Sequence, residues 1–341
     1  MISPWEAYAT TAGTLCWRYR SSEVPRIPDA YVNSVVYIYP TPQAAERSGR
    51  GGGCGVLVGV GFEKIPNLAH IYVVTNIHVK ARNRIVRYNT RRGPQILDLT
   101  TSRWFDHPEG WDVSVCQLPP LFFFDERMTM IPDTTFMTKE RMGDIPLRHG
   151  DELFMVSRYA DHPGETDNEP VVRFGTLAKV RPVVMPAAAR KQEGFLAEMR
   201  SLPGHSGSPA FIYYTGMQLR LGAEPVDKLP KPNIYLLRID CAHPSVKSKV
   251  FGDDGKEFAG FHVRENSGMA CIVPAWRIAE ILENDELRKA RREMEDALLE
   301  EPPEEDLALD TDEDEFIRLR NLARHRLAVP EAEADETDSQ V

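Results

Sequence analysis

Residues 203–212 read Pro-Gly-His-Ser-Gly-Ser-Pro-Ala-Phe-Ile. A serine attacks a carbonyl group only when a base takes its proton and backbone N–H groups hold the oxyanion that forms. Gly204 allows a turn that points its own N–H and that of Ser206 into one pocket, and Gly207 leaves room for a substrate. Ser206 is therefore a candidate nucleophile, with Gly204 and Ser206 as candidate oxyanion donors. Taken alone, the same residues also fit a tight turn that enters a strand.

On both sides of this stretch the chain consists of short β-branched and aromatic runs separated by Gly, Pro and Asp. Clear examples are residues 31–40, 54–62, 70–79 and 234–241. Many short strands with turn residues between them predict an all-β barrel or sandwich, and the absence of strand–helix–strand alternation disfavours a parallel sheet. A strand rather than a helix follows Ser206, which also disfavours an α/β-hydrolase.

A histidine and an aspartate stand at strand edges earlier in the chain. His78 ends the apolar run 70–79, and an imidazole suits a general base because its pKa lies near neutral pH. Asp112 directly precedes the run 113–116, where a carboxylate can hold the imidazole in one tautomer. Each residue alone also fits a structural role, as a strand-end filler or a strand cap. The order His78, Asp112, Ser206 matches a known catalytic triad, and we predict that the three residues form one.

The chain resembles the trypsin-like serine peptidases over residues 30–284, and within them the disulfide-free bacterial kind, such as the Deg-type (HtrA) and glutamyl-endopeptidase relatives. The matching segments, in family order, are SVVYIYP (34–40), GGGCGVLVG (51–59), YVVTNIHV (72–79), WDVSVCQL (111–118), HGDELFMVSR (149–158), VRFGTL (172–177), PGHSGSPAF (203–211), IYLLRID (234–240) and GMACIVPAWRIAEIL (268–282).

This resemblance implies a peptidase domain over 28–284 made of two perpendicular six-stranded antiparallel β-barrels, about 28–125 and 145–284. The active site would lie between them, with His78 and Asp112 from the first barrel and Ser206 from the second. The implied activity is that of a serine endopeptidase that cleaves a protein or peptide substrate through an acyl-enzyme on Ser206. No cofactor or metal is expected. The alternative is a catalytically inactive domain of the same fold that binds a protein.

The segment before the serine departs from the family in ways that bear on activation and specificity. His205 stands where secreted trypsins have Asp, so activation by a newly freed N-terminal amine would find no partner here. In the family, the segment that includes Arg200, Ser201 and Leu202 lines the pocket for the residue N-terminal to the cleaved bond. Arg200 in that pocket would favour an acidic side chain, unless it points to solvent.

Cysteine usage and charge limit the remaining functions. The five cysteines, Cys16, Cys54, Cys116, Cys241 and Cys271, are scattered and form no CxxC pair, which favours reduced, buried thiols and a cytoplasmic protein. The family resemblance implies that the protein is bacterial. We see no signal peptide and no apolar run long enough to span a membrane. The net charge is −10, and residues 283–341 hold 21 acidic and eight basic residues. This charge balance argues against nucleic-acid binding.

Two terminal regions flank the predicted peptidase domain. Residues 1–27 form an N-terminal extension without a clear period, and residues 285–341 form an acidic tail with helical stretches and a disordered end. The tail either keeps the protein soluble or carries a docking helix at 314–329 for a regulatory protein. Residues 216–233 and 246–256 are predicted to be long loops, because both contain several turn residues.

Overall fold

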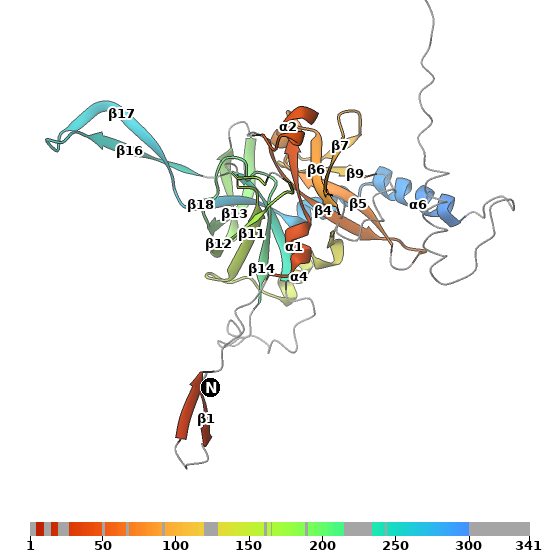
Figure 1. The fold of residues 1–341 in the computed structure, drawn as a ribbon, viewed down its shortest axis with the longest axis horizontal. Coiled ribbons are helices and arrows are strands. Elements are labelled where there is room, and N and C mark those ends of the chain that lie inside the picture. The colour runs from red at the N-terminus through yellow and green to blue at the C-terminus, as the bar shows by residue number, and fades with distance from the viewer. Residues whose placement is uncertain are drawn as a thin grey trace, which may run out of the picture.

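The computed structural model describes residues 5–9, 15–19, 27–49, 52–65, 68–90, 93–118, 129–159, 162–164, 166–187, 190–214, 234–242 and 244–299. The predicted loop at 216–233 and the predicted docking helix at 314–329 lie outside these residues. The described part is mostly β-structure, as predicted, with six short or medium helices (Figure 1).

The first β unit is an eight-stranded sheet in the order β7-β6-β3-β4-β5-β9-β8, with β10 paired in parallel to β4. Its central strands β4 and β5 are valine-rich and almost fully buried, as expected of β-branched residues covered on both faces. The strands are β3 (Val35–Tyr39), β4 (Gly53–Gly61), β5 (Ala69–Thr75), β6 (Ile85–Thr90), β7 (Gly93–Asp98), β8 (Trp104–Asp106), β9 (Ser114–Gln117) and β10 (Ile131–Pro132).

This unit differs from the closed six-stranded barrel that the family resemblance implied. Its end strands β7 and β8 pair with no further strand in the described part of the chain. Strand β8 has only three residues, and β7 is partly exposed along its whole length. Such strands offer few hydrogen bonds and little apolar surface for closing a barrel, so the first unit is an open sheet over the described residues.

The second β unit is a closed barrel of six strands in the order β11-β12-β13-β18-β15-β14, and it confirms one of the two predicted barrels. Register shifts interrupt the pairing of β12 with β13 and of β14 with β15. Bulges of this kind bend strands and help a sheet to close. The strands are β11 (Glu152–Ser157), β12 (Val171–Ala187), β13 (Arg190–Glu198), β14 (Pro209–Tyr213), β15 (Ile234–Ala242) and β18 (Met269–Pro274).

Two hairpins lie outside these units. The N-terminal one joins β1 (Trp5–Ala9) to β2 (Leu15–Tyr19). The other joins β16 (Ser245–Phe251) to β17 (Glu257–Asn266), so the loop predicted over 246–256 is wrong for residues 246–251. Strand β16 was not predicted, because its side chains are largely exposed and show no alternation of buried and exposed residues.

The helices are short apart from the last. They are α1 (Asp29–Asn33), α2 (Pro42–Glu46), α3 (Ile77–Lys80), α4 (Lys139–Asp144), α5 (Ala275–Leu282) and α6 (Asp285–Leu299), with a 3-10 turn at Asp133–Thr135. In the described residues, no helix has the length and apolar character needed to cross a membrane.

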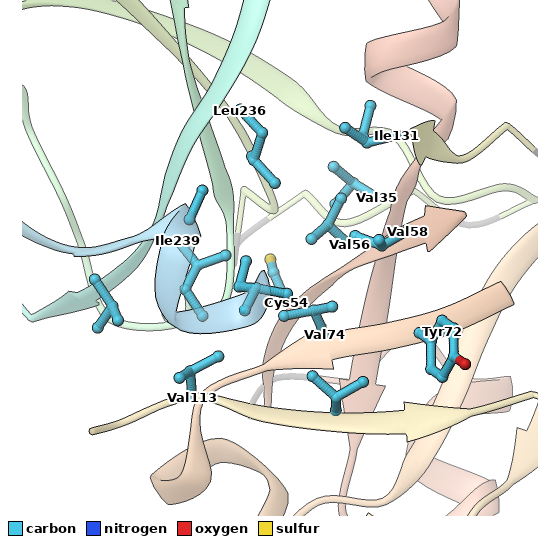
Figure 2. Packing of buried hydrophobic residues seen from close by; sticks show 14 of the residues in the cluster. Val35, Cys54, Val56, Val58, Tyr72, Val74, Val113, Ile131, Leu236 and Ile239 are labelled. Carbon is cyan, nitrogen blue, oxygen red and sulfur yellow. The ribbon is translucent and has the colours of Figure 1, made fainter. Parts of the chain in front are cut away.

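One hydrophobic cluster joins the two β units. It takes Val35, Cys54, Val56 and Val74 from the first sheet and Leu236 and Ile239 from the barrel, as Figure 2 shows. Helix α5 adds Ile278 and Ile281, which are buried. Because a shared core of this size is removed from water, the relative position of the two units is fixed by packing. Any site built from both units is therefore held in place by this core.

Helix α6 packs on the first β unit, although its sequence is strongly charged. Its Glu295 is buried and accepts hydrogen bonds from His70 Nε2 at 3.0 Å and from the amides of Glu63 and Lys64 at 3.1 and 2.9 Å. Burial alone would raise the pKa of Glu295, but these hydrogen bonds outweigh it and lower the pKa. The domain boundary at residues 284/285 stays a prediction, and α6 is attached to the first unit.

We expect Glu295→Ala to destabilise the protein by about 3 kcal/mol, because the buried His70 ring and two amides would lose their acceptor. The matched control is Glu293→Ala, whose side chain is 65% exposed, and its effect should stay within about 0.5 kcal/mol. Urea unfolding of both variants measures the difference. Equal stability of the two variants would show that α6 is not held by this contact.

Candidate active site

His78 and Asp112 lie in direct contact in the first β unit. Strand β5 ends at Thr75, and the short helix α3 that follows presents His78. The ring nitrogen Nδ1 of His78 lies 2.5 Å from Oδ2 of Asp112, and the His78 amide donates to Asp112 Oδ1 at 3.1 Å. One carboxylate thus holds both the ring and the backbone of the histidine, and Nε2 remains for a substrate or nucleophile.

A third residue fixes the aspartate. The side chain of Asn76 is buried, and its Nδ2 donates to the Asp112 carbonyl oxygen at 2.8 Å. The His78 side chain is 50% exposed, whereas that of Asp112 is 15% exposed. The carboxylate is thus more shielded from water than the imidazole ring that it holds.

Ser206 lies in a tight loop at the start of strand β14, and the amides of this loop fall into two groups. Those of His205, Gly207 and Ser208 donate to the carbonyl oxygens of Leu202, Asp240 and His205 at 3.0, 2.8 and 2.8 Å. Those of Gly204 and Ser206 donate to no acceptor in the described part of the chain, and both residues are partly exposed. The open amides are the two that the sequence singled out as oxyanion donors.

His205 shapes this loop. Its side chain is buried, and its Nδ1 accepts the amide of Leu202 at 3.1 Å, which closes the turn. Gly204 has a φ of 92°, a left-handed conformation that glycine adopts without strain. His205, the position at which this sequence differs from the secreted trypsins, thus stabilises the loop from within.

The loop of Ser206 is fastened to the first β unit close to the histidine. The Cys54 amide at the start of β4 donates to the Ser206 carbonyl oxygen at 2.8 Å. A Cβ added to Gly53 would lie 2.9 Å from that oxygen and 2.9 Å from the side chain of Val79. Gly53 therefore keeps a narrow gap between the serine loop and the residue after His78. The Ser206 hydroxyl makes no hydrogen bond to the described residues.

Two separate features disfavour any residue other than glycine at position 207. Its φ is 86°, and an added Cβ would lie 1.9 Å from the Cys54 carbonyl oxygen. We expect Gly207→Ala to destabilise the protein by more than the roughly 1–2 kcal/mol that a left-handed alanine costs, because backbone atoms must also move. Gly150→Ala is the matched control, since Gly150 has a φ of 84° and open space around it. Urea unfolding compares them, and equal losses would contradict the predicted clash.

Asp240 is a member of this site that sequence reasoning missed. It lies in β15, is 1% exposed, and accepts the Ser201 hydroxyl at 2.6 Å. Burial raises the pKa of Asp240 to about 7, while the Ser201 hydrogen bond and the nearby His78 act in the opposite direction. Its Oδ1 has no hydrogen-bond partner among the described residues. Its surroundings in the sequence, an apolar strand, gave no sign of this role.

The three predicted pocket residues differ in exposure. Arg200 is exposed, Ser201 is buried against Asp240, and Leu202 is partly exposed. Their role in substrate binding stays a prediction. Ser201 also accepts a hydrogen bond from Asn266 Nδ2 through its carbonyl oxygen, so it links the end of β17 to Asp240.

Four of the five cysteines are described with their side chains, and all four are buried free thiols. Burial raises the pKa of the Cys54 thiol, which lies beside the serine loop. In the described ranges no group of three or more His, Cys, Asp or Glu side chains could hold a metal ion.

Comparison with known proteins gives structural neighbours only. No family model matches the sequence, and no curated protein matches it. The protease domain of MamO from Magnetospirillum magneticum is 14% identical and has a TM-score of 0.45, covering 75% of this chain and 98% of its own.

Two further solved structures are proteases as well. The HtrA-type protease AlgW with a tripeptide is 14% identical, with a TM-score of 0.40, and covers 76% of this chain and 64% of its own. A mutant of the tobacco etch virus protease is 13% identical, with a TM-score of 0.39, and covers 77% and 83%. The chain is thus similar in structure to protease domains of the HtrA type and to a viral protease.

Proposed function

We propose that this chain is a serine endopeptidase that hydrolyses peptide bonds through an acyl-enzyme on Ser206. His78 acts as the general base and then as the general acid, and Asp112 orients its ring. The amides of Gly204 and Ser206 stabilise the oxyanion. The substrate is a polypeptide, and cleavage is limited and regulated. A regulatory protein would dock on the tail at residues 314–329, which lie outside the described residues.

The proposed reaction has two stages, and in each of them His78 accepts a proton and then donates a proton. In the first, His78 Nε2 takes the Ser206 hydroxyl proton as Oγ attacks the scissile carbonyl carbon, and the proton then goes to the leaving amine. In the second, His78 takes a proton from water as the water oxygen attacks the acyl carbon, and it then gives a proton to Ser206 Oγ as the bond between Oγ and that carbon breaks. Asp112 holds the Nδ1–H and stabilises the imidazolium in both stages.

One observation carries this proposal. In the loop around Ser206 the amides of His205, Gly207 and Ser208 have carbonyl acceptors, whereas those of Gly204 and Ser206 have no acceptor in the described residues. Both residues are partly exposed, so these two amides stay open to a group that approaches from solvent. Oxyanion stabilisation is a function that requires them.

The proposal is tested by incubating the full chain with unfolded casein, with and without Ser206→Ala. We expect fragments from the wild type and none from Ser206→Ala. The matched control is Ser208→Ala, because Ser208 is a buried serine two positions after Ser206. Its cleavage rate should stay within about tenfold of that of the wild type. Binding of casein without cleavage by any of the three proteins would favour the catalytically inactive binding domain.

A further inference from the structure

The hairpin of β16 and β17, here called the ribbon, projects from the second barrel (Figure 1). Its two strands pair with each other and with no other described strand. One face exposes three apolar side chains, namely Val246, Phe261 and Val263, which are 48%, 66% and 49% exposed, and at its base it also carries Glu265, across from Val246. A solvated two-stranded sheet is marginally stable by itself, and its open edges can accept another strand.

The opposite face of the ribbon is cationic. Lys247 lies directly across from Arg264, and Lys249 lies across from His262. Lys249 is paired with Glu257 at 2.7 Å, but Lys247 and Arg264 form no ion pair with the described residues. Like charges directly opposite each other destabilise a hairpin, so an anionic partner on this face would stabilise the ribbon.

The ribbon has one mainly apolar face and one cationic face, and this difference restricts the kind of partner that can bind it. A lipid surface could cover only one face. A nucleic acid would leave the apolar face in water and would meet the ribbon's own carboxylates, Asp253, Asp254, Glu257 and Glu265. An added β-strand, in contrast, sends alternate side chains to both faces and bonds to the open edge. The fitting partner is thus an extended segment with acidic residues on one side and apolar residues on the other.

The chain itself contains such a segment in residues 304–313, EEDLALDTDE, which lie outside the described residues and include no basic residue. In an extended strand its two leucines, Leu307 and Leu309, would share one face, which carries Glu305 and Glu313 at its two ends. The other face would carry four carboxylates, from Glu304, Asp306, Asp310 and Asp312. We propose that this segment from a second copy of the chain adds to the ribbon as a third strand.

The added strand comes from a second copy because residues 304–313 begin only five residues after the end of helix α6. Helix α6 ends at Leu299, and Figure 1 shows α6 and the ribbon on opposite ends of the body. The five residues from Leu299 to Glu304 span about 17 Å when fully extended. The docked strand would also lie near the candidate site, because Asn266 at the end of the ribbon bonds to Ser201, three residues before Gly204.

The test is sedimentation equilibrium of the full chain over a range of concentrations and salt. We expect reversible self-association that weakens as NaCl is raised, since exposed charges are screened. The double variant Lys247→Glu, Arg264→Glu should raise the dissociation constant about tenfold or more. Combining it with Glu304→Lys, Asp306→Lys, Asp310→Lys and Asp312→Lys should restore association, because the charges are exchanged.

Two controls separate this contact from general charge effects. Lys289→Glu with Arg292→Glu makes the same change in net charge on the exposed side of α6 and should leave the dissociation constant within about twofold. A peptide of residues 304–313 should dissociate the complex, and a peptide of the same composition without the alternation should not. A chain that is monomeric throughout, a ribbon variant that associates like wild type, or equal competition by both peptides would overturn the proposal.

Discussion

Replacing Asp112 with asparagine is expected to lower kcat by about 10⁴-fold while leaving the fold intact. The carboxylate contacts the His78 ring at 2.5 Å and also accepts its backbone amide. An asparagine in its place can offer an N–H to Nδ1, which stabilises the wrong tautomer and puts the ring proton on Nε2. A ring protonated at Nε2 cannot take the proton of Ser206. Initial rates of casein cleavage at saturating substrate measure the loss.

The matched control is Asp106→Asn, in the neighbouring strand β8. Asp106 lies 2.9 Å from Lys80 and accepts the Ser114 hydroxyl, but it does not contact His78. Its replacement should change kcat by less than about threefold. Similar losses for both variants would mean that Asp112 acts through stability of the region rather than through the histidine.

The second large effect concerns stability and pH. Burial raises the pKa of Asp240 from 3.8 to about 7 in the folded protein. Between these values the unfolded chain releases the proton that the folded chain keeps, so rising pH favours unfolding. At about 1.36 kcal/mol per pH unit, the wild type loses about 4 kcal/mol of unfolding free energy through this group between about pH 4 and pH 7. The loss is complete above pH 7. Asp240→Asn removes this loss and should therefore gain stability relative to wild type as pH rises.

Urea unfolding of both proteins at pH 5 and pH 8 measures this difference. Ser201→Ala is the informative companion, because the Ser201 hydrogen bond lowers the pKa of Asp240. Its removal should raise that pKa further, so that the loss of stability continues to higher pH. A stability difference between wild type and Asp240→Asn that stays constant from pH 5 to pH 8 would show that the carboxyl is ionised throughout.

Much of the β-structure could be predicted from the sequence because its signal is local. The runs that became β4 and β5 are rich in valine and buried on both faces, so their composition alone indicates strands. The contact of His78 with Asp112 was expected from residue order and family resemblance together. Strand composition could not predict that the first unit stays open over the described residues, since that depends on whether the edge strands β7 and β8 find partners.

The residues that were missed are polar residues in unusual places. Asp240 lies in an apolar strand, and Glu295 lies in a charged helix, yet both are buried. A pattern of charges normally predicts a solvated face, and only the tertiary contacts with Ser201 and His70 reveal these exceptions. Strand β16 of the ribbon was missed for the opposite reason, because it is exposed on both faces and shows no alternation of buried and exposed residues.

The central claim is that Ser206 is a nucleophile activated by His78, and covalent labelling with a fluorophosphonate probe tests it most directly. The folded full chain is incubated with the probe, and the adduct is located by mass spectrometry. We expect one adduct per chain on Ser206, lost in Ser206→Ala and slowed at least about 10³-fold in His78→Ala. A folded chain that forms no adduct on Ser206, or one labelled equally fast without His78, would contradict the claim.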